Sequence, residues 1–200
     1  MIRQGSPEWK DEKLGAITGT RAHDLISSNV TRRTLMALLI RELVTANTKE
    51  FFKQSLQEKL EIEPEAASYY SLMNNVIVTH QDAYIVSEIS PMLAVSPDGL
   101  VGDDGGFECK RLDDENHIKM LLGMDPEKKY VHQCHWNMYI TGRQWWDLFY
   151  YCETLPESMR SLTIRIDRDQ DMMVKMHMHA EAMIGDVKTF LTAHGLGGLL

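Results

Sequence analysis

The chain has 200 residues, of which 44% are hydrophobic and 25% are charged, a composition typical of a soluble globular domain and not of a disordered tail. Its 29 acidic and 21 basic residues give a net charge of −8, which excludes a uniformly basic nucleic-acid coat protein. No apolar run approaches the roughly 20 residues that cross a bilayer, and the N-terminus does not resemble a signal peptide. Three cysteines, Cys109, Cys134 and Cys152, lack CxxC spacing, which favours reduced thiols. We therefore expect a cytoplasmic protein with no membrane partner and one domain over residues 1–200.

The first part of the chain has helical patterns. Leucines recur at helical spacing over residues 34–46 and predict an amphipathic helix capped by Thr31 or Thr34. Residues 50–72 are again helical in pattern, and Pro64 predicts that one helix ends and another begins there, because proline suits a first turn and breaks a helix interior.

The middle of the chain changes to strand patterns. Val, Ile and Tyr are frequent in residues 75–88, and the apolar run 92–95 is stopped by a Ser-Pro-Asp-Gly turn at residues 96–99. A second turn at residues 102–106 precedes a short strand over residues 107–111. This pattern predicts a β-meander with one tight hairpin.

The second half alternates helices and strands. Residues 115–123 and 127–140 are helical in pattern, and residues 145–151 and 161–166 are predicted strands. Residues 169–194 predict a long closing helix whose methionine-rich stripe belongs to the core. The whole pattern predicts an α/β fold with a mixed central sheet of about five strands flanked by helices.

Two carboxylates and a lysine around the predicted hairpin form the candidate site. Glu108 and Lys110 are two apart in a strand and therefore project to the same face, about 6.6 Å apart along the chain, whereas the Cys109 side chain points away. A hairpin would fold Asp98 back beside them. Two carboxylates hold a hard cation such as Mg²⁺ through oxygen, with positions left for water and phosphate, and the Cys109 carbonyl could supply another oxygen.

This site suits phosphodiester hydrolysis. The cation polarises a phosphoryl oxygen, while Lys110 orients the nucleophile or neutralises developing charge. An exposed Glu–Lys pair after a surface turn is the alternative that these three residues leave open when they are taken alone.

With Pro97, Asp98, Glu108 and Lys110, the chain resembles the PD-(D/E)XK nucleases, specifically the phage lambda exonuclease type (YqaJ-like viral recombinase exonucleases). Further motifs of that family follow in order along the chain. They are residues 4–9 and 14–20 at the front, the Glu-Pro-Glu-Ala segment 63–66, and Gln133 with residues 138–141. The resemblance implies a single domain of the PD-(D/E)XK (restriction-endonuclease-like) fold.

The resemblance also implies roles for individual residues. Asp98, Glu108 and the Cys109 carbonyl would bind Mg²⁺, and Lys110 would serve the attacking water. Glu63 would face the metals, and Gln133 would support the site by hydrogen bonds. Whether Mn²⁺ can replace Mg²⁺ is left open by the sequence.

Binding of the DNA end is implied for a second group of residues. Lys13, Thr20 and Ser96 fall where the family grips the terminal 5′-phosphate, although Lys13 is a point charge where Arg is common. Leu56 stands where the family has an apolar wedge. The basic pair Arg32 and Arg33 precedes a helix and is either a contact to the DNA backbone or a solvated pair.

The resemblance implies a Mg²⁺-dependent 5′-to-3′ exonuclease that degrades one strand of linear double-stranded DNA to mononucleotides and leaves 3′ overhangs for phage-type recombination. It also implies a homotrimeric ring, a single-strand annealing protein as partner, and a phage or prophage gene product acting in the host cytosol. Two alternatives keep part of this reading: a restriction- or repair-type endonuclease, and a non-catalytic subunit that binds DNA ends.

Overall fold

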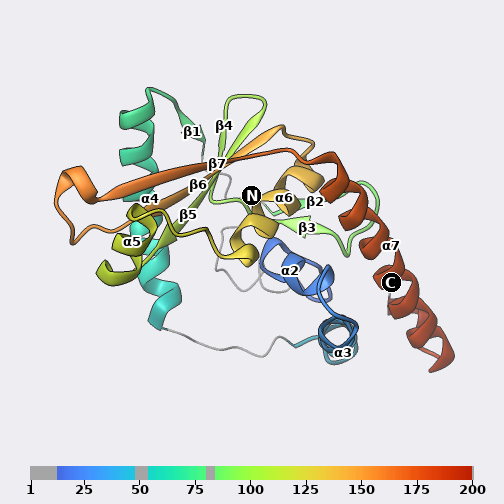
Figure 1. Ribbon diagram of the computed structural model, residues 1–200. Helices are drawn as coiled ribbons and strands as arrows, with labels where there is room; N and C mark the ends of the chain where they lie inside the picture. The colour runs from blue at the N-terminus through green and yellow to red at the C-terminus, as the bar shows by residue number, and fades with distance from the viewer. Residues whose placement is uncertain (1–12, 48–53, 80–83, 200) are drawn as a thin grey trace.

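A mixed five-stranded sheet lies at the centre of the computed structural model, which describes residues 13–47, 54–79 and 84–199, and no side chains for residues 54–61 (Figure 1). Its order is β1-β4-β5-β6-β7, with strands Val78–Thr79 (β1), Gly99–Val101 (β4), Gly105–Arg111 (β5), Trp145–Tyr151 (β6) and Ser161–Asp167 (β7). β5 and β6 are parallel, and the other neighbours in this sheet are antiparallel. Strands Ile85–Val86 (β2) and Ala94–Val95 (β3) form a separate antiparallel pair.

Helices precede, connect and follow these strands. They are η1 (Gly19–Arg21), α2 (Ala22–Leu25), α3 (Asn29–Thr45), α4 (Gln54–Asn74), α5 (Asp114–Leu121), α6 (Lys128–Thr141), η2 (Glu157–Met159), α7 (Gln170–Ala193) and η3 (Gly197–Leu199). The predicted class of fold, an α/β domain with a mixed five-stranded sheet flanked by helices, is thus confirmed.

Helices cover both faces of the sheet. On one face, Phe107 and Cys109 of β5 pack with Ala66 and Tyr70 of α4. On the other face, residues of β6 pack against α6, as Leu148 and Tyr150 do with Cys134 and Met138. Alternate residues of β5 therefore point to different helices, and the even-numbered ones point to α6.

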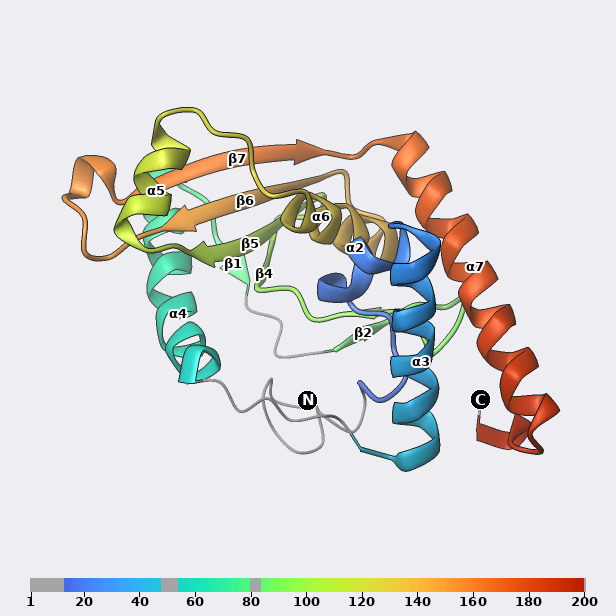
Figure 2. The same cartoon turned by 60° about the horizontal axis from the view of Figure 1, so that its bottom comes forward.

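A second hydrophobic cluster lies beside the sheet. Helices α2, α3 and α7 gather next to α6, on the side away from α4 (Figure 2). The predicted stripe of α7 supplies Met176, Met183 and Val187 to this cluster, which also contains Trp136 of α6. Within the described residues, no helix is both long and apolar enough to cross a membrane.

Three sequence predictions need correction. α3 begins at Asn29 and is capped by the Ser28 hydroxyl, which accepts from the Thr31 N–H, so Thr31 and Thr34 are not its caps. α4 continues through Pro64, because the packing of the following turns on the sheet outweighs the loss of one helical hydrogen bond. The predicted meander is divided, since β2 and β3 pair with each other and not with the central sheet.

Candidate active site

The β4–β5 hairpin brings Asp98 back beside β5. Gly99 of β4 lies opposite Phe107 of β5, and Asp98 is the residue just before this pair. Asp98 Oδ2 accepts a hydrogen bond of 2.9 Å from the backbone N–H of Cys109. The carboxylate is therefore fixed at the edge of the strand that carries Glu108, as the sequence predicted.

Glu108 and Lys110 point to the same face of β5 and form a buried ion pair. Lys110 Nζ lies 2.6 Å from Glu108 Oε1. Glu108 is 0% exposed and Lys110 is 9% exposed. The alternative of an exposed surface pair is therefore wrong.

Helix α6 supplies two amide side chains to this pair. Gln133 donates from Nε2 to Glu108 Oε1 at 2.7 Å, and its Oε1 accepts from Lys110 Nζ at 3.1 Å. Asn137, one turn later, donates from Nδ2 to Glu108 Oε2 at 3.2 Å. Sequence reasoning missed Asn137; its i+4 spacing from Gln133 on one helix was the available signal.

A cavity of about 760 Å³ lies next to Lys110, at the carboxyl ends of β5 and β6. Tyr130 of α6 lines it, and Lys110 Nζ lies 4.8 Å from the centre of the Tyr130 ring. The remaining walls come from the end of β5 and the start of α5 (109–115) and from residues 152–154. Lys110 thus borders a space large enough for a nucleotide-sized group.

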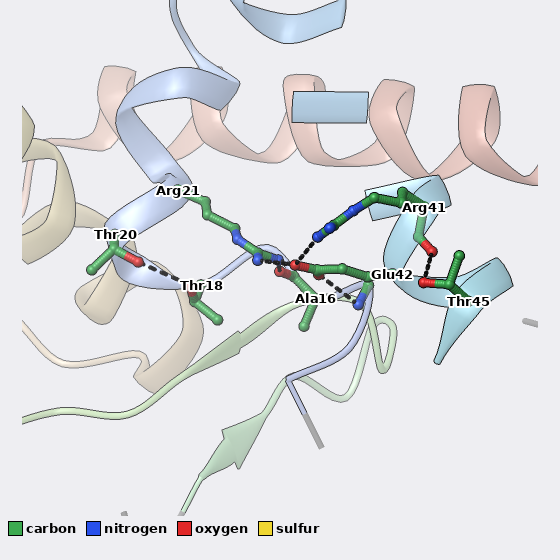
Figure 3. Close-up of polar contacts among 8 residues, drawn as sticks. Ala16, Thr18, Thr20, Arg21, Arg41, Glu42 and Thr45 are labelled. Atoms are coloured by element: carbon green, nitrogen blue, oxygen red, sulfur yellow. Dashed lines mark hydrogen bonds and ion pairs between the residues drawn. The ribbon is translucent and has the colours of Figure 1, made fainter. Parts of the chain in front are cut away.

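The loop of residues 13–20 is tied to α3 by a buried ion pair (Figure 3). Arg21 donates from Nη2 to Glu42 Oε1 at 2.6 Å and from Nη1 to Glu42 Oε2 at 2.9 Å. Arg21 Nη1 also donates to the Ala16 carbonyl at 2.7 Å, and the Gly15 N–H donates to Glu42 Oε2 at 3.1 Å. One carboxylate therefore fixes both the backbone of the loop and the arginine that follows it.

This loop runs beside the segment that leads to Asp98. Ile17 forms a parallel bridge with Leu93, three residues before Ser96. Lys13 lies at the start of the loop, and Thr20 is exposed at its end. The structure therefore brings the loop that contains Lys13 and Thr20 close to the segment that contains Ser96, and binding of a 5′-phosphate by these three stays a prediction.

The other predicted residues lie on other elements or outside the described residues. Glu63 is in α4, on the face of the sheet opposite to the one that α6 covers. The side chain of Leu56 is outside the described residues, as is the motif at residues 4–9. Arg32 donates to the Ser27 carbonyl at 2.5 Å, and Arg32 and Arg33 line a hollow of about 280 Å³ between α3 and α7. Their contact with DNA stays a prediction.

The donors at the edge of β5 fit Mg²⁺. The Cys109 N–H points toward Asp98, and because the N–H and C=O of a strand residue point to the same edge, the Cys109 carbonyl does too. Carboxylate and carbonyl oxygens are the ligands that Mg²⁺ prefers, usually with water and substrate phosphate in the remaining positions. In the described part of the chain, no group of three or more His, Cys, Asp or Glu side chains is placed to hold a metal ion.

The cysteines near the site are free and buried. Burial raises the pKa of the Cys134 thiol well above its ordinary value, and the negative charge of Glu108 adds to this shift. The thiol is therefore neutral near physiological pH and is not a nucleophile.

A histidine pair links α6 to α2 behind the site. His132, the residue before Gln133, has its Nδ1 atom 2.9 Å from His23 Nδ1, and the two rings are stacked. Burial lowers the pKa of His132 to about 4, and the charges of His23, His135, Lys175 and Lys128 add to the shift. The folded protein therefore holds His132 neutral where the unfolded chain protonates it.

We expect this pair to make folding sensitive to acid. Between pH 6.5 and pH 4, the unfolded chain binds a proton at His132 that the folded chain does not, so stability falls as the pH falls. The melting temperature should fall as the pH is lowered from 6.5 to 4. In His132→Gln this fall should be smaller by about 3 °C, which corresponds to roughly 1 kcal/mol after allowance for partial exposure. Thermal melts across this pH range measure the effect. His194→Gln, at the exposed end of α7, is the control and should keep the wild-type slope; an equal slope in His132→Gln would refute the prediction.

A buried Glu–Lys pair beside an aspartate is the arrangement that the sequence predicted for a nuclease. Residues 8–144 match the YqaJ-like viral recombinase domain, and the chain belongs to this family. The predicted resemblance to exonucleases of the phage lambda type is thereby confirmed.

Solved structures are similar over nearly the whole chain. An alkaline exonuclease from Laribacter hongkongensis (LHK-Exo) is 29% identical, with 95% of this chain and 96% of that chain covered and a TM-score of 0.87. LHK-Exo in complex with dAMP is 30% identical, with 94% and 95% covered and a TM-score of 0.85. A phage related exonuclease from Haemophilus somnus 129PT shares the fold at 12% identity, with 90% and 96% covered and a TM-score of 0.72. A comparison with curated protein sequences gives no match.

Proposed function

We propose that the protein is a Mg²⁺-dependent 5′-to-3′ exonuclease that degrades one strand of linear double-stranded DNA to mononucleotides. The observation that carries this proposal is the buried Glu108–Lys110 pair, with Asp98 fixed on the adjacent backbone. The family and the similarity to LHK-Exo, an alkaline exonuclease, support the same activity.

Asp98, Glu108 and the Cys109 carbonyl are the groups that would hold Mg²⁺, with Mn²⁺ as the alternative ion and Glu63 near it. The ion would supply polarisation of a phosphoryl oxygen and a lower pKa for bound water. The protein's part is to hold both carboxylates in place before substrate arrives, through the Cys109 N–H at Asp98 and the α6 amides at Glu108.

Lys110 is the residue that acts on the attacking water. Its ammonium lies between Glu108 Oε1 and Gln133 Oε1, at 2.6 and 3.1 Å, so its position is fixed by two acceptors. A cation held there orients the nucleophile and offsets the negative charge that develops on the phosphate. Gln133 hydrogen-bonds both the Glu108 carboxylate and the Lys110 ammonium, which keeps the distance between these two groups constant.

The direction of digestion depends on recognition of the 5′ end. We assign the terminal 5′-phosphate to Lys13, Thr20 and Ser96, which lie on adjoining segments. Leu56 would separate the end of the duplex, and Arg32 and Arg33 would contact the DNA backbone.

The Lys13 assignment predicts a change in end preference. Lys13→Ala should reduce the rate advantage of 5′-phosphorylated over 5′-hydroxylated duplex about tenfold, because a hydrogen bond to a charged group contributes about 1.5 kcal/mol or more. Initial rates on both substrates measure the ratio. Lys188→Ala, an exposed lysine of α7, is the matched control; a ratio unchanged by Lys13→Ala would remove Lys13 from the site.

In the organism, the product would be a 3′ single-stranded overhang for phage-type recombination in the host cytosol. We propose a homotrimeric ring as the active assembly and a single-strand annealing protein as the partner that takes up the overhang. The match to a viral recombinase domain supports this context.

Closed circular DNA separates an exonuclease from an endonuclease. We expect the purified protein with Mg²⁺ to digest a linearised plasmid, to leave the closed circle intact, and to lose activity when EDTA removes the metal. Efficient cutting of the circle would instead establish the endonuclease alternative. If neither form were digested, the result would support the alternative of a non-catalytic subunit that binds DNA ends.

A further inference from the structure

Asn137 is a buried polar residue of α6 that none of the sequence motifs singled out. It is 2% exposed and lies four residues after Gln133, so both amides project from the same side of the helix. Its Nδ2 donates to Glu108 Oε2 at 3.2 Å. Its position is thus set by α6 and directed at a carboxylate proposed to bind the metal.

The two oxygens of Glu108 are held by different groups. Oε1 accepts from Lys110 and Gln133, at 2.6 and 2.7 Å, whereas Oε2 accepts from Asn137. Donors on Oε1 hold the carboxylate at one of its oxygens. A donor on Oε2 adds a second point of attachment that further restrains rotation about the last side-chain bond, and with it the direction in which the carboxylate offers its remaining lone pairs.

Asn137 also contacts the loop that contains the predicted 5′-phosphate ligands. A Cβ atom built on Gly19 would lie 2.9 Å from Asn137 Oδ1 and 3.1 Å from Gln133 Cγ. The backbone at Gly19, one residue before Thr20, is therefore seated directly on the two amides that hold Glu108. Close approach explains the glycine at this position.

We propose that Asn137 is a positioning residue, which orients Glu108 for the metal and couples it to the Gly19 loop, so that the position of the DNA end and the orientation of the carboxylate depend on each other. This inference rests on the proposed function, since it assumes that Glu108 acts in phosphodiester hydrolysis. In the proposed reaction, Asn137 itself contacts neither the attacking water nor the phosphate.

The first test removes or shortens the amide donor. Asn137→Leu has nearly the same shape but no N–H and no added charge, and Asn137→Ser keeps a shorter donor. We expect Asn137→Leu to lower kcat about 30-fold and to weaken Mg²⁺ binding about tenfold, with KM for DNA within twofold of wild type, and Asn137→Ser to recover part of both losses. Mg²⁺ binding is measured by titration calorimetry without DNA, so that the readout is independent of activity.

Tyr139→Phe is the matched control on the same helix, because it removes one hydrogen bond, to His177 Nδ1, without touching Glu108. Kinetics and Mg²⁺ binding of Asn137→Leu equal to those of Tyr139→Phe would overturn the inference. A wild-type protein that digests no DNA with Mg²⁺ would overturn the proposed function instead, so the two failures are distinct.

The second test uses the contact with Gly19, so it does not require the Asn137→Leu variant to fold well. Gly19→Ala should lower both the melting temperature and kcat, because its methyl group meets Asn137 Oδ1. Adding Asn137→Ala removes that oxygen, so the double variant should lose less than the sum of the two single losses. Additive losses in the double variant would refute the coupling between the loop and Asn137.

Discussion

Replacing Glu108 by Gln is expected to reduce digestion of linear duplex DNA about 10³-fold or more, since it removes a carboxylate proposed to bind the metal and a negative charge beside Lys110. Lys110, Gln133 and Asn137 all donate hydrogen bonds to this side chain. An amide in its place presents an N–H to at least one of those donors and removes a negative charge from beside a buried ammonium. Release of acid-soluble nucleotides from linear duplex measures the loss.

The control for this variant is Glu181→Gln, an exposed carboxylate of α7 paired with His177. It should retain wild-type activity, because an exposed pair of this kind contributes little. Undiminished digestion by Glu108→Gln would show that the buried pair is structural and that the catalytic centre lies elsewhere.

The second large effect is on stability. Glu42→Ala should lower the free energy of unfolding by about 3–5 kcal/mol, which is roughly 10 °C in melting temperature for a chain of this size. Glu42 is 2% exposed and accepts from Arg21 twice and from the Gly15 N–H, so its removal takes an acceptor from the buried Gly15 N–H and the counter-charge from the partly buried Arg21 (Figure 3). Thermal and urea melts measure the change.

Glu115→Ala provides the comparison, because Glu115 forms an exposed i,i+4 pair with Lys119. Its loss should change stability by no more than about 0.5 kcal/mol. If Glu42→Ala were equally mild, the pair with Arg21 would not be what holds the 13–20 loop on α3.

The centre of the candidate site could be predicted because it depends on sequence patterns within one short segment. The predicted turn at residues 102–106 between two short apolar segments predicts the hairpin, and the two-residue period of a strand puts Glu108 and Lys110 on one face. Both features are present in the structure. Gln133 was reached through family resemblance and lies against the pair.

The contacts between distant segments were not predictable in this way. Glu42 meets Arg21 from another helix, and Asn137 contacts Glu108 from the helix that covers this face of the sheet. No periodicity within one segment encodes which helix covers which face. The continuation of α4 through Pro64 was missed for a similar reason, since packing against the sheet decided it rather than local preference.

Part of the negative charge behind the net value of −8 lies inside the molecule. Several carboxylates are buried with donors of their own, among them Asp98, Glu108, Glu42 and Asp147. Asp147, for example, accepts from Arg165 and from the Tyr70 hydroxyl. Because these charges are inside the molecule, the whole-chain value says little about the surface that would meet DNA.

A time course on linear duplex labelled at either end tests the proposed function most directly. With Mg²⁺ and a 5′-phosphate, we predict that a 5′ label is released as mononucleotide at once, while a 3′ label stays in a strand that shortens from its 5′ end. Glu108→Gln should release neither label. Early release of the 3′ label, or label loss that is the same in wild type and Glu108→Gln, would contradict a 5′-to-3′ exonuclease acting through this site.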